Sequence, residues 1–272
     1  ADLAMYHSKE SGRNQLYFFE QQMQQRLRQR QQLETALKHA LANNEFRLYY
    51  QPKMDKHGNL AGYEALLRWL QPEQGLIPPD VFIPLAESTG LIIDIGNWVL
   101  QTACEQISQF ANSGKPLPIA VNVSERQLVQ KDFVDQVSHI VANSGINPAL
   151  LELELTESML HHDLESTRQK MQALSSLGIM FSLDDFGTGY SSLSYLKKLP
   201  IRVLKIDQSF VSEFLSQETD KAIVRTILAM AEALSLQVVA EGVEQQQQFD
   251  ALRDMGCDLF QGYLFGKPAP LP

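Results

Sequence analysis

From Phe46 onward, the chain alternates short apolar runs with longer segments of helical character. Strands that alternate with helices indicate an α/β fold with mainly parallel strands. Eight such strands in a domain of this length predict a TIM-like (β/α)8 barrel, which typically needs about 250 residues. An open doubly wound sheet is the alternative, but it more often carries a Gly-rich phosphate turn after its first strand, and none is present. The expected strands are residues 46–51, 62–69, 118–123, 150–156, 179–184, 202–207, 237–242 and 258–262.

The connection between the first two expected strands is short. Only a turn-like segment, "PKMDKHGNLA", lies between them, whereas a parallel crossover takes a dozen or more residues. We therefore expect an antiparallel hairpin, which makes the barrel a variant with an antiparallel first strand.

Polar residues share one face of the expected strands. In "LLELELT" (150–156) the leucines alternate with Glu152 and Glu154, and successive side chains of a strand point to opposite faces. The leucines suit the outer helices, so the two glutamates are expected to point into the barrel. The same alternation directs further polar residues inward, namely Gln51, Glu64, Arg68, Asn122, Ser182, Asp184, Lys205, Glu241 and Gln261.

These inward residues lie at or near the C-terminal ends of their strands, apart from the reversed first strand. Barrel interiors are usually packed with Val, Ile and Leu, and polar residues at the C-terminal ends are typical of catalytic sites. A structural polar network is the other interpretation and suits a single inward Asn or Gln. Burying several carboxylates without compensation would, however, cost several kcal/mol each. The pattern therefore predicts an active site at the barrel mouth.

The expected site is anionic. Its ligand atoms are oxygens, without Cys or His, which suits Mg²⁺ or Mn²⁺ rather than zinc, and Ca²⁺ also fits. Two ions about 4 Å apart are the usual arrangement for an in-line displacement at phosphorus. The acidic residues Glu64, Glu154, Asp184, Asp185 and Glu241 face only two basic ones, Lys205 and Arg68.

Two adjacent aspartates stand in the segment "FSLDDFGTGY". Asp184 is the last inward residue of its strand, and Asp185 would point outward if the strand continued straight. Gly187 and Gly189 permit a sharp turn. We therefore expect the backbone to turn after Asp184 and to bring Asp185 over the barrel mouth, so that the pair serves two metal ions.

Bulk properties narrow the classes of partner. The 272 residues are 44% hydrophobic and carry a formal net charge of −9, which argues against binding to DNA or to an anionic membrane. With only two cysteines, no disulfide framework is expected, and a reducing, cytoplasmic location is favoured. Residues 21–44 are rich in Gln, Arg and Leu and lack Gly and Pro, which predicts a helical linker.

Several segments together resemble the EAL-domain phosphodiesterases of bacterial cyclic di-GMP signalling. "YEALLRW" (63–69) contains the Glu64-Ala65-Leu66 signature, and it is followed in order by "VNVS", "ELTES", "DDFGTGYSSL", "LKID", "AEGVE" and "QGYLFGKP". The resemblance covers residues 45–272. It implies a barrel with an antiparallel first strand that hydrolyses cyclic di-GMP to linear 5′-pGpG.

The resemblance also implies roles for the matched residues. The ligands of two Mg²⁺ or Mn²⁺ ions would be Glu64, Asn122, Glu154, Asp184 and Asp185. Residues with a part in catalysis would be Lys205 at the attacking water or phosphate, Glu241 as base or water-mediated ligand, Gln261 in the water network, and Glu157 as the anchor of the loop after Asp185. Substrate contacts would come from Gln51, Leu66, Arg68, Glu244 and Phe265, the last two near a guanine.

Two other functions remain open. A non-hydrolysing cyclic di-GMP receptor would keep Gln51, Arg68 and Glu244 but would not need the metal ligands. An unrelated metal-dependent barrel enzyme, such as an aldolase or another phosphohydrolase, would not need the combined motifs. The complete set of matched residues favours the working phosphodiesterase.

Residues 1–20 resemble the end of a GGDEF domain in "AMY", a following Lys, and "GRN". The resemblance implies a GGDEF–EAL tandem of which this chain is the C-terminal part, with room for a membrane anchor in N-terminal regions outside it. The resemblance to EAL domains also implies a homodimer, formed through the side of the barrel near the loop after the fifth expected strand. No membrane contact is expected of the chain itself.

Overall fold

The strands expected from the alternating pattern are all present in the computed structural model, which describes residues 21–160, 163–187 and 196–271. One strand was not expected, the short β3 that follows the hairpin. The strands are β1 (Phe46–Asp55), β2 (Leu60–Gln71), β3 (Gly75–Ile77), β4 (Ile119–Asn122), β5 (Leu151–Thr156), β6 (Met180–Phe186), β7 (Val203–Ile206), β8 (Gln237–Ala240) and β9 (Leu259–Gln261).

These strands form one sheet that closes on itself. In the described ranges the order is β1-β9-β8-β7-β6-β5-β4-β2-β3, and β1 also pairs with β2. Eight strands therefore close a barrel, and β3 stays at the edge of β2. The strand β1 is antiparallel to both of its neighbours, while β2 pairs in parallel with β4. The predicted barrel with an antiparallel first strand is confirmed.

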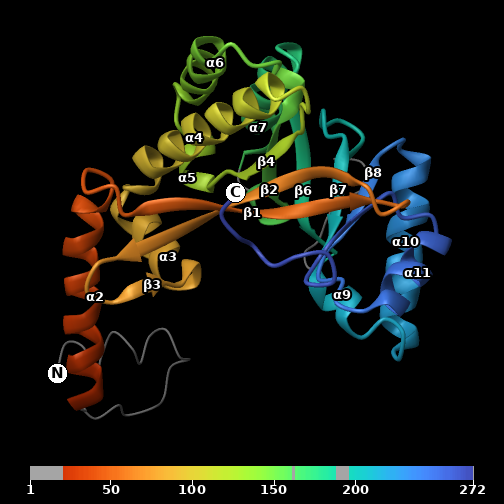
Figure 1. Ribbon diagram of the computed structural model, residues 1–272, viewed down its shortest axis with the longest axis horizontal. Coiled ribbons are helices and arrows are strands. Elements are labelled where there is room, and N and C mark those ends of the chain that lie inside the picture. Colours follow the sequence, from red (N-terminus) through yellow and green to blue (C-terminus); the bar gives the residue numbers. More distant parts are fainter. Residues whose placement is uncertain (1–20, 161–162, 188–195, 272) are drawn as a thin grey trace.

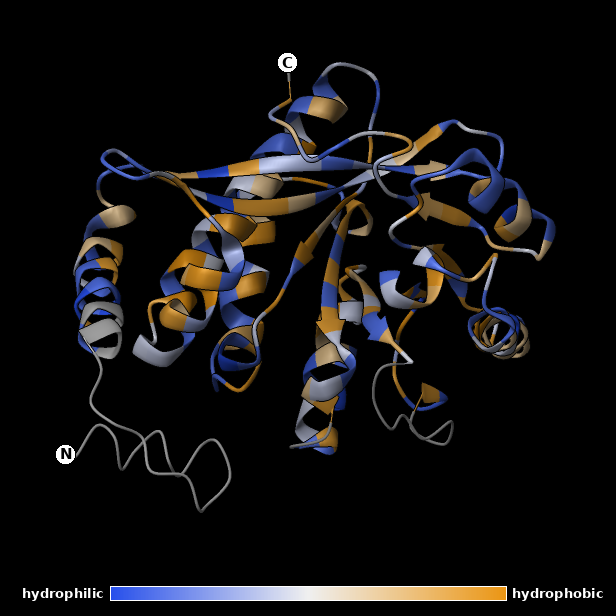
Figure 2. Cartoon of the chain, turned by 90° about the horizontal axis from the view of Figure 1, so that it is seen from below, coloured by the Kyte–Doolittle hydropathy of each residue, from blue (hydrophilic) through white to orange (hydrophobic). Residues whose placement is uncertain are grey.

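Helices surround the barrel, with α4, α6 and α7 on one side and α10 and α11 on the other (Figure 1). Blue and white bands interrupt the orange of the strands in Figure 2, because polar residues alternate with apolar ones along them. The helices are α2 (Gln21–Ala40), α3 (Pro79–Thr89), α4 (Ile92–Asn112), α5 (Glu125–Leu128), α6 (Phe133–Ser144), α7 (Leu164–Ser176), α9 (Gln208–Ser212), α10 (Glu218–Ala233) and α11 (Gln246–Asp254), with 3₁₀ turns η1 (Pro148–Leu150) and η2 (Glu157–Leu160).

The hairpin of β1 and β2 is longer than the sequence pattern suggested. The Asp55 carboxylate closes the turn by accepting hydrogen bonds from the backbone N–H groups of His57 and Asn59, both at 2.8 Å. The connection therefore shrinks to residues 56–59, and β1 continues through Asp55. This extension turns Lys53, expected in the connection, into a strand residue.

The apolar and polar faces of β5 separate as expected. Leu151, Leu153 and Leu155 are buried in the hydrophobic core, whereas Glu152 and Glu154 form ion pairs inside the barrel. Burial of the leucines against the outer helices favours the register that sends both glutamates inward.

The helix α2 confirms the helix expected over the N-terminal residues. Leu37 and Ala40, in its last turn, are buried in the same core as the barrel. Its role as an interdomain linker stays a prediction, and the resemblance to a GGDEF domain falls on residues 1–20, outside the described ranges. Within those ranges, no helix combines the length and apolar character needed to cross a membrane.

Gly262, directly after β9, lies against the backbone of Val243. Gly262→Ala is expected to lower the free energy of unfolding by about 3 kcal/mol, because a Cβ atom there would collide with the Val243 N and O atoms. Gly58→Ala is the control: Gly58 has φ of 78° and nothing within 4 Å of an added Cβ, so only backbone strain of about 1 kcal/mol is expected. Urea unfolding of both variants tests this, and equal losses would contradict it.

Candidate active site

The centre of the barrel holds a lysine surrounded by carboxylates. Lys205, on β7, is fully buried, and its Nζ lies 2.7 Å from Glu241 Oε1, 2.8 Å from Glu154 Oε2 and 3.0 Å from Asp184 Oδ2. Glu64 Oε2 is 3.6 Å away. Four strands or strand ends therefore deliver one carboxylate each to a single ammonium group.

Amide side chains hold the Glu64 carboxylate from two sides. Asn122 Nδ2 donates to Glu64 Oε1 at 2.7 Å, and Gln261 Nε2 donates to Glu64 Oε2 at 2.5 Å and to Gln51 Oε1 at 3.0 Å. Gln51 in turn donates to the carbonyl of Gly266 at 3.2 Å. Asn122 was expected inside the barrel; at the end of β4 it is exposed at the rim but still reaches Glu64.

The adjacent aspartates separate by a change in backbone conformation. Asp184 is buried, and its Oδ1 accepts a hydrogen bond from the Asp185 N–H at 2.9 Å. Asp185 has φ of 55°, and the pairing of β6 with β7 shifts register between Leu183 and Phe186. We had expected the strand to end at Asp184. It continues instead through a bulge to Phe186. Asp185 itself makes the turn and is exposed. Gly189 lies outside the described residues.

A cavity of about 340 Å³ opens above this cluster. Asp185, Leu66 and Glu244 line it together with residues of the central network. The cavity thus brings charged side chains of β2, of β6 and of the segments after β7 and β8 to one mouth. The lining residues are Gln51, Glu64, Leu66, Arg68, Asp185, Asp207, Gln208, Glu241, Gly242, Glu244, Gln261, Gly262, Tyr263 and Pro268.

Burial and mutual repulsion shift the acidic groups of the cluster. Burial, followed by the charge of Glu64, holds the pKa of Glu154 well above its usual range, and burial raises the pKa of Glu241 to about 8. Burial would lower the pKa of Lys205, but the surrounding carboxylates outweigh it and raise that pKa. The lysine is therefore charged, and the carboxylates exceed the positive charge available to them.

A family model described as EAL domain matches residues 34–268. The chain belongs to the EAL domain family. The match begins inside α2, ahead of residue 45, where the sequence pattern set the start of the domain.

Two relatives from Pseudomonas aeruginosa align with this EAL domain over nearly its whole length. It is 44% identical over 272 residues to the bifunctional diguanylate cyclase/cyclic di-GMP phosphodiesterase MucR of Pseudomonas aeruginosa, covering 99% of this chain and 40% of MucR. It is 43% identical over 273 residues to the cyclic di-GMP phosphodiesterase NbdA of the same organism, covering 100% of this chain and 35% of NbdA. The chain thus spans well under half the length of these relatives.

A solved structure of PaMucR phosphodiesterase in complex with c-di-GMP has the same fold. It superposes with a TM-score of 0.85 at 44% identity, covering 88% of this chain and 98% of that one. The FimX EAL domain of Pseudomonas aeruginosa bound to c-di-GMP has a TM-score of 0.80 at 25% identity, covering 87% and 96% of the two chains.

The donor atoms of this EAL domain fit Mg²⁺ or Mn²⁺ in chemistry and charge. Carboxylate and amide oxygens are the ligands that these ions prefer, and the surplus of buried carboxylates calls for additional positive charge. Within the described ranges, no three acidic, Cys or His side chains are yet arranged around one point as ligands. The carboxylates converge instead on Lys205 Nζ.

Glu157 and Phe265 are predicted site residues that are not among the described residues lining the cavity. Glu157, on η2, is buried, and its Oε2 accepts a hydrogen bond from the Gly187 N–H at 3.1 Å; its Oε1 has no partner among the described residues. Phe265 is half-buried with its ring centroid 5.5 Å from that of Phe249, and it is not among the described residues that line the cavity.

Sequence reasoning missed three charged or aromatic residues of the site. Asp207 and Tyr263 line the cavity, and Lys53 lies inside the barrel with its Nζ 3.1 Å from Glu152 Oε1 and 3.5 Å from Glu154 Oε1. The segments "LKID" and "QGYLFGKP" contain the first two. Lys53 would have been found if the expected first strand had been extended by two residues, because it then shares the inward face of Gln51.

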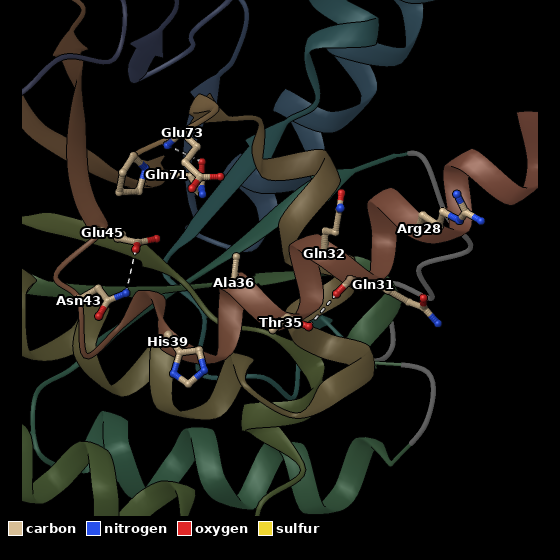
Figure 3. A pocket seen from close by; sticks show the side chains of 11 residues that line it. Arg28, Gln31, Gln32, Thr35, Ala36, His39, Asn43, Glu45, Gln71 and Glu73 are labelled. Atoms are coloured by element: carbon tan, nitrogen blue, oxygen red, sulfur yellow. Dashed lines mark hydrogen bonds between the residues drawn. The ribbon is translucent and has the colours of Figure 1, made fainter.

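A larger cavity, of about 780 Å³, lies beside α2 (Figure 3). Arg28, Thr35 and His39 of α2 line it together with Glu45 and Glu73. Its short-range hydrogen bonds, such as Asn43 to Glu45 at 3.1 Å, are exposed. This cavity lacks the buried converging charges of the barrel mouth.

Proposed function

We propose that this EAL domain is a metal-dependent phosphodiesterase that hydrolyses cyclic di-GMP to linear 5′-pGpG. The observation that carries the proposal is the convergence of four carboxylates on buried Lys205 directly below a cavity lined by Arg68. MucR and NbdA, which carry phosphodiesterase names, support the same activity.

Glu64, Asn122, Glu154 and Asp184 would hold one divalent ion, and Asp184 and Asp185 would help to hold a second. When bound, such ions neutralise the phosphate and lower the pKa of a water molecule. The exposed position of Asp185 over the cavity and the buried position of Asp184 beneath it support a division of labour between the two aspartates.

Formation of a 5′-phosphate requires that a water oxygen bond to phosphorus while the bond from phosphorus to the 3′ oxygen breaks. The water loses a proton and the 3′ oxygen gains one. Burial raises the pKa of Glu241 to about 8, so its carboxylate form, which is suited to accept the proton, becomes the main form above that pH. Lys205, held charged by its neighbours, is suited to donate a hydrogen bond to the phosphate.

Arg68 would bind the substrate phosphate or base. Its Nη1 donates to the Leu67 carbonyl at 2.9 Å, and its guanidinium lies 5.6 Å from the centroid of the Tyr49 ring, so the side chain is already oriented at the mouth. Arg68→Ala is expected to raise KM about tenfold with little change in kcat, as for loss of one charge-assisted hydrogen bond. Steady-state kinetics measure this; a fall confined to kcat would instead place Arg68 in the chemical step.

The decisive experiment is incubation with cyclic di-GMP and Mn²⁺, followed by chromatographic detection of pGpG. A reaction that stops when a chelator removes the ion supports the proposal. Binding without turnover supports the receptor, for which the cavity residues Gln51, Arg68 and Glu244 would suffice. Neither binding nor turnover would point to another substrate.

We further propose that the chain forms a homodimer through the barrel side near the loop after β6. Residues 188–195 of that loop lie outside the described ranges. Sedimentation at several protein concentrations tests the dimer, and a monomer throughout would contradict it.

A further inference from the structure

A second lysine lies inside the barrel and has no part in the proposed reaction. Lys53, on β1, is 4% exposed. Its Nζ lies 3.1 Å from Glu152 Oε1 and 3.5 Å from Glu154 Oε1. Glu152 is itself 5% exposed. It precedes Glu154 by two residues on β5 and therefore lies deeper in the barrel. A buried charged pair of this kind is retained by a fold only where it is well compensated.

The Glu154 carboxylate is held between two lysines. Its Oε2 lies 2.8 Å from Lys205 Nζ, and its Oε1 faces Lys53. In the described part of the chain, both hydrogen bonds to this carboxylate come from lysines. Rotation of the carboxylate would break one of the two contacts, so together they fix its plane.

The antiparallel first strand explains how Lys53 reaches this depth. Gln51 pairs with Glu64 near the mouth, and Lys53 pairs with Gly62 of β2 and with Gln261 of β9. Because β1 runs against the other strands, its later inward residue lies farther from the mouth. Lys53 therefore approaches Glu154 from below, while Lys205 contacts it from the other side.

We propose that Lys53 is a positioning residue that orients Glu154 for metal binding, with Glu152 balancing its charge. The inference rests on the proposed function, because Glu154 is a metal ligand only if the domain is a metal-dependent phosphodiesterase. Partners that orient a metal ligand from behind commonly change metal affinity by about 10- to 100-fold when removed. Lys53 occupies that position relative to Glu154.

The test must separate orientation from charge and from folding. Lys53→Met alone would leave the buried Glu152 without its cation and Glu154 with Lys205 alone, which would endanger the fold. The double variant Lys53→Met/Glu152→Gln removes one positive and one negative charge and nearly keeps both side-chain volumes. The net charge of the barrel interior is then unchanged, and Glu154 loses its contact with Lys53 while its contact with Lys205 remains.

Lys170→Met is the matched control. Lys170 is half-buried on α7, and its Nζ donates to the carbonyls of Leu128 and Gln130 at 2.6 and 2.8 Å. The Lys170→Met variant thus loses two hydrogen bonds of a lysine that lies outside the barrel. We expect this control to unfold at a lower temperature than the wild type while its Kd for Mn²⁺ stays the same.

Mn²⁺ binding is measured by calorimetry and by thermal shift on the intact chain, without substrate. The double variant is expected to show a Kd for Mn²⁺ about tenfold above that of the wild type. With Mn²⁺ saturating, its KM for cyclic di-GMP should be unchanged, because the cavity residues are intact. A merely structural role would lower the unfolding temperature without this change in Kd.

Each other outcome has a definite meaning. A folded double variant whose Kd stays within about twofold of the wild type overturns the inference. So does a double variant that remains unfolded in saturating Mn²⁺, because Lys53 would then serve the fold and not the site. A wild type that binds no Mn²⁺ overturns both the inference and the metal assignment, whereas one that binds Mn²⁺ without producing pGpG overturns the proposed function alone.

Discussion

Asp184→Asn is expected to reduce kcat for cyclic di-GMP by at least about 1000-fold, equivalent to about 4 kcal/mol of transition-state stabilisation. The substitution keeps the size of the side chain but removes the charge that faces Lys205 at 3.0 Å. It also removes a carboxylate that is proposed to bind the metal ions. The Asn side chain can still accept the hydrogen bond of the Asp185 N–H, which lies 2.9 Å from Asp184 Oδ1, so the bulge should persist.

The measurement is single-turnover production of pGpG at saturating Mn²⁺, together with the rise in unfolding temperature that Mn²⁺ causes. Both signals are expected to fall in Asp184→Asn. Asp258→Asn is the control, because Asp258 Oδ2 accepts a hydrogen bond from the Val238 N–H at 2.9 Å near the start of β8, away from the mouth. If Asp184→Asn turned over as fast as this control, the metal assignment would be wrong.

The barrel could be predicted because each strand carries two signals at once. The leucines of β5 identify the face that packs on helices, and the alternating glutamates identify the interior. The connection between the first two strands is too short for a parallel crossover, so an antiparallel hairpin could be predicted. These are local properties of the sequence, and burial against the helices fixes the register that they specify.

The errors concern strand ends and backbone conformation, which depend on tertiary contacts. The Asp55 carboxylate tightens the first turn and extends β1 to include Lys53. Asp185 adopts a left-handed conformation, whereas we had expected Gly187 and Gly189 to permit the turn. Asp is among the residues that tolerate this conformation, but the sequence does not say which residue of "DDFG" will adopt it.

The position of the carboxylates also clarifies what the sequence left open about the metal. Composition predicted an anionic site, and the structure adds that Lys205 lies at its centre, within 3.6 Å of four carboxylates. The ammonium partly neutralises the cluster. A divalent ion bound by the proposed ligands would share these carboxylates with Lys205.

Lys205→Met is expected to lower kcat by at least about 1000-fold, because general acid–base and electrostatic contributions at such positions are each worth 10²–10⁴. It should also destabilise the metal-free protein by about 3–5 kcal/mol, the usual effect of breaking a buried ion pair. The reason is that Glu64, Glu154, Asp184 and Glu241 would lose the cation that they share.

The two effects should respond differently to Mn²⁺. The ion supplies positive charge to the same carboxylates, so the unfolding temperature of Lys205→Met is expected to rise more on adding Mn²⁺ than that of the wild type. Activity should not recover, because no other described lysine lies within reach of Asp184 or Glu241. Lys221→Met, which removes an ion pair of 3.5 Å with Glu218 on α10, should leave kcat unchanged. Recovery of full turnover by Mn²⁺ would show that Lys205 serves only to balance charge and takes no part in the reaction.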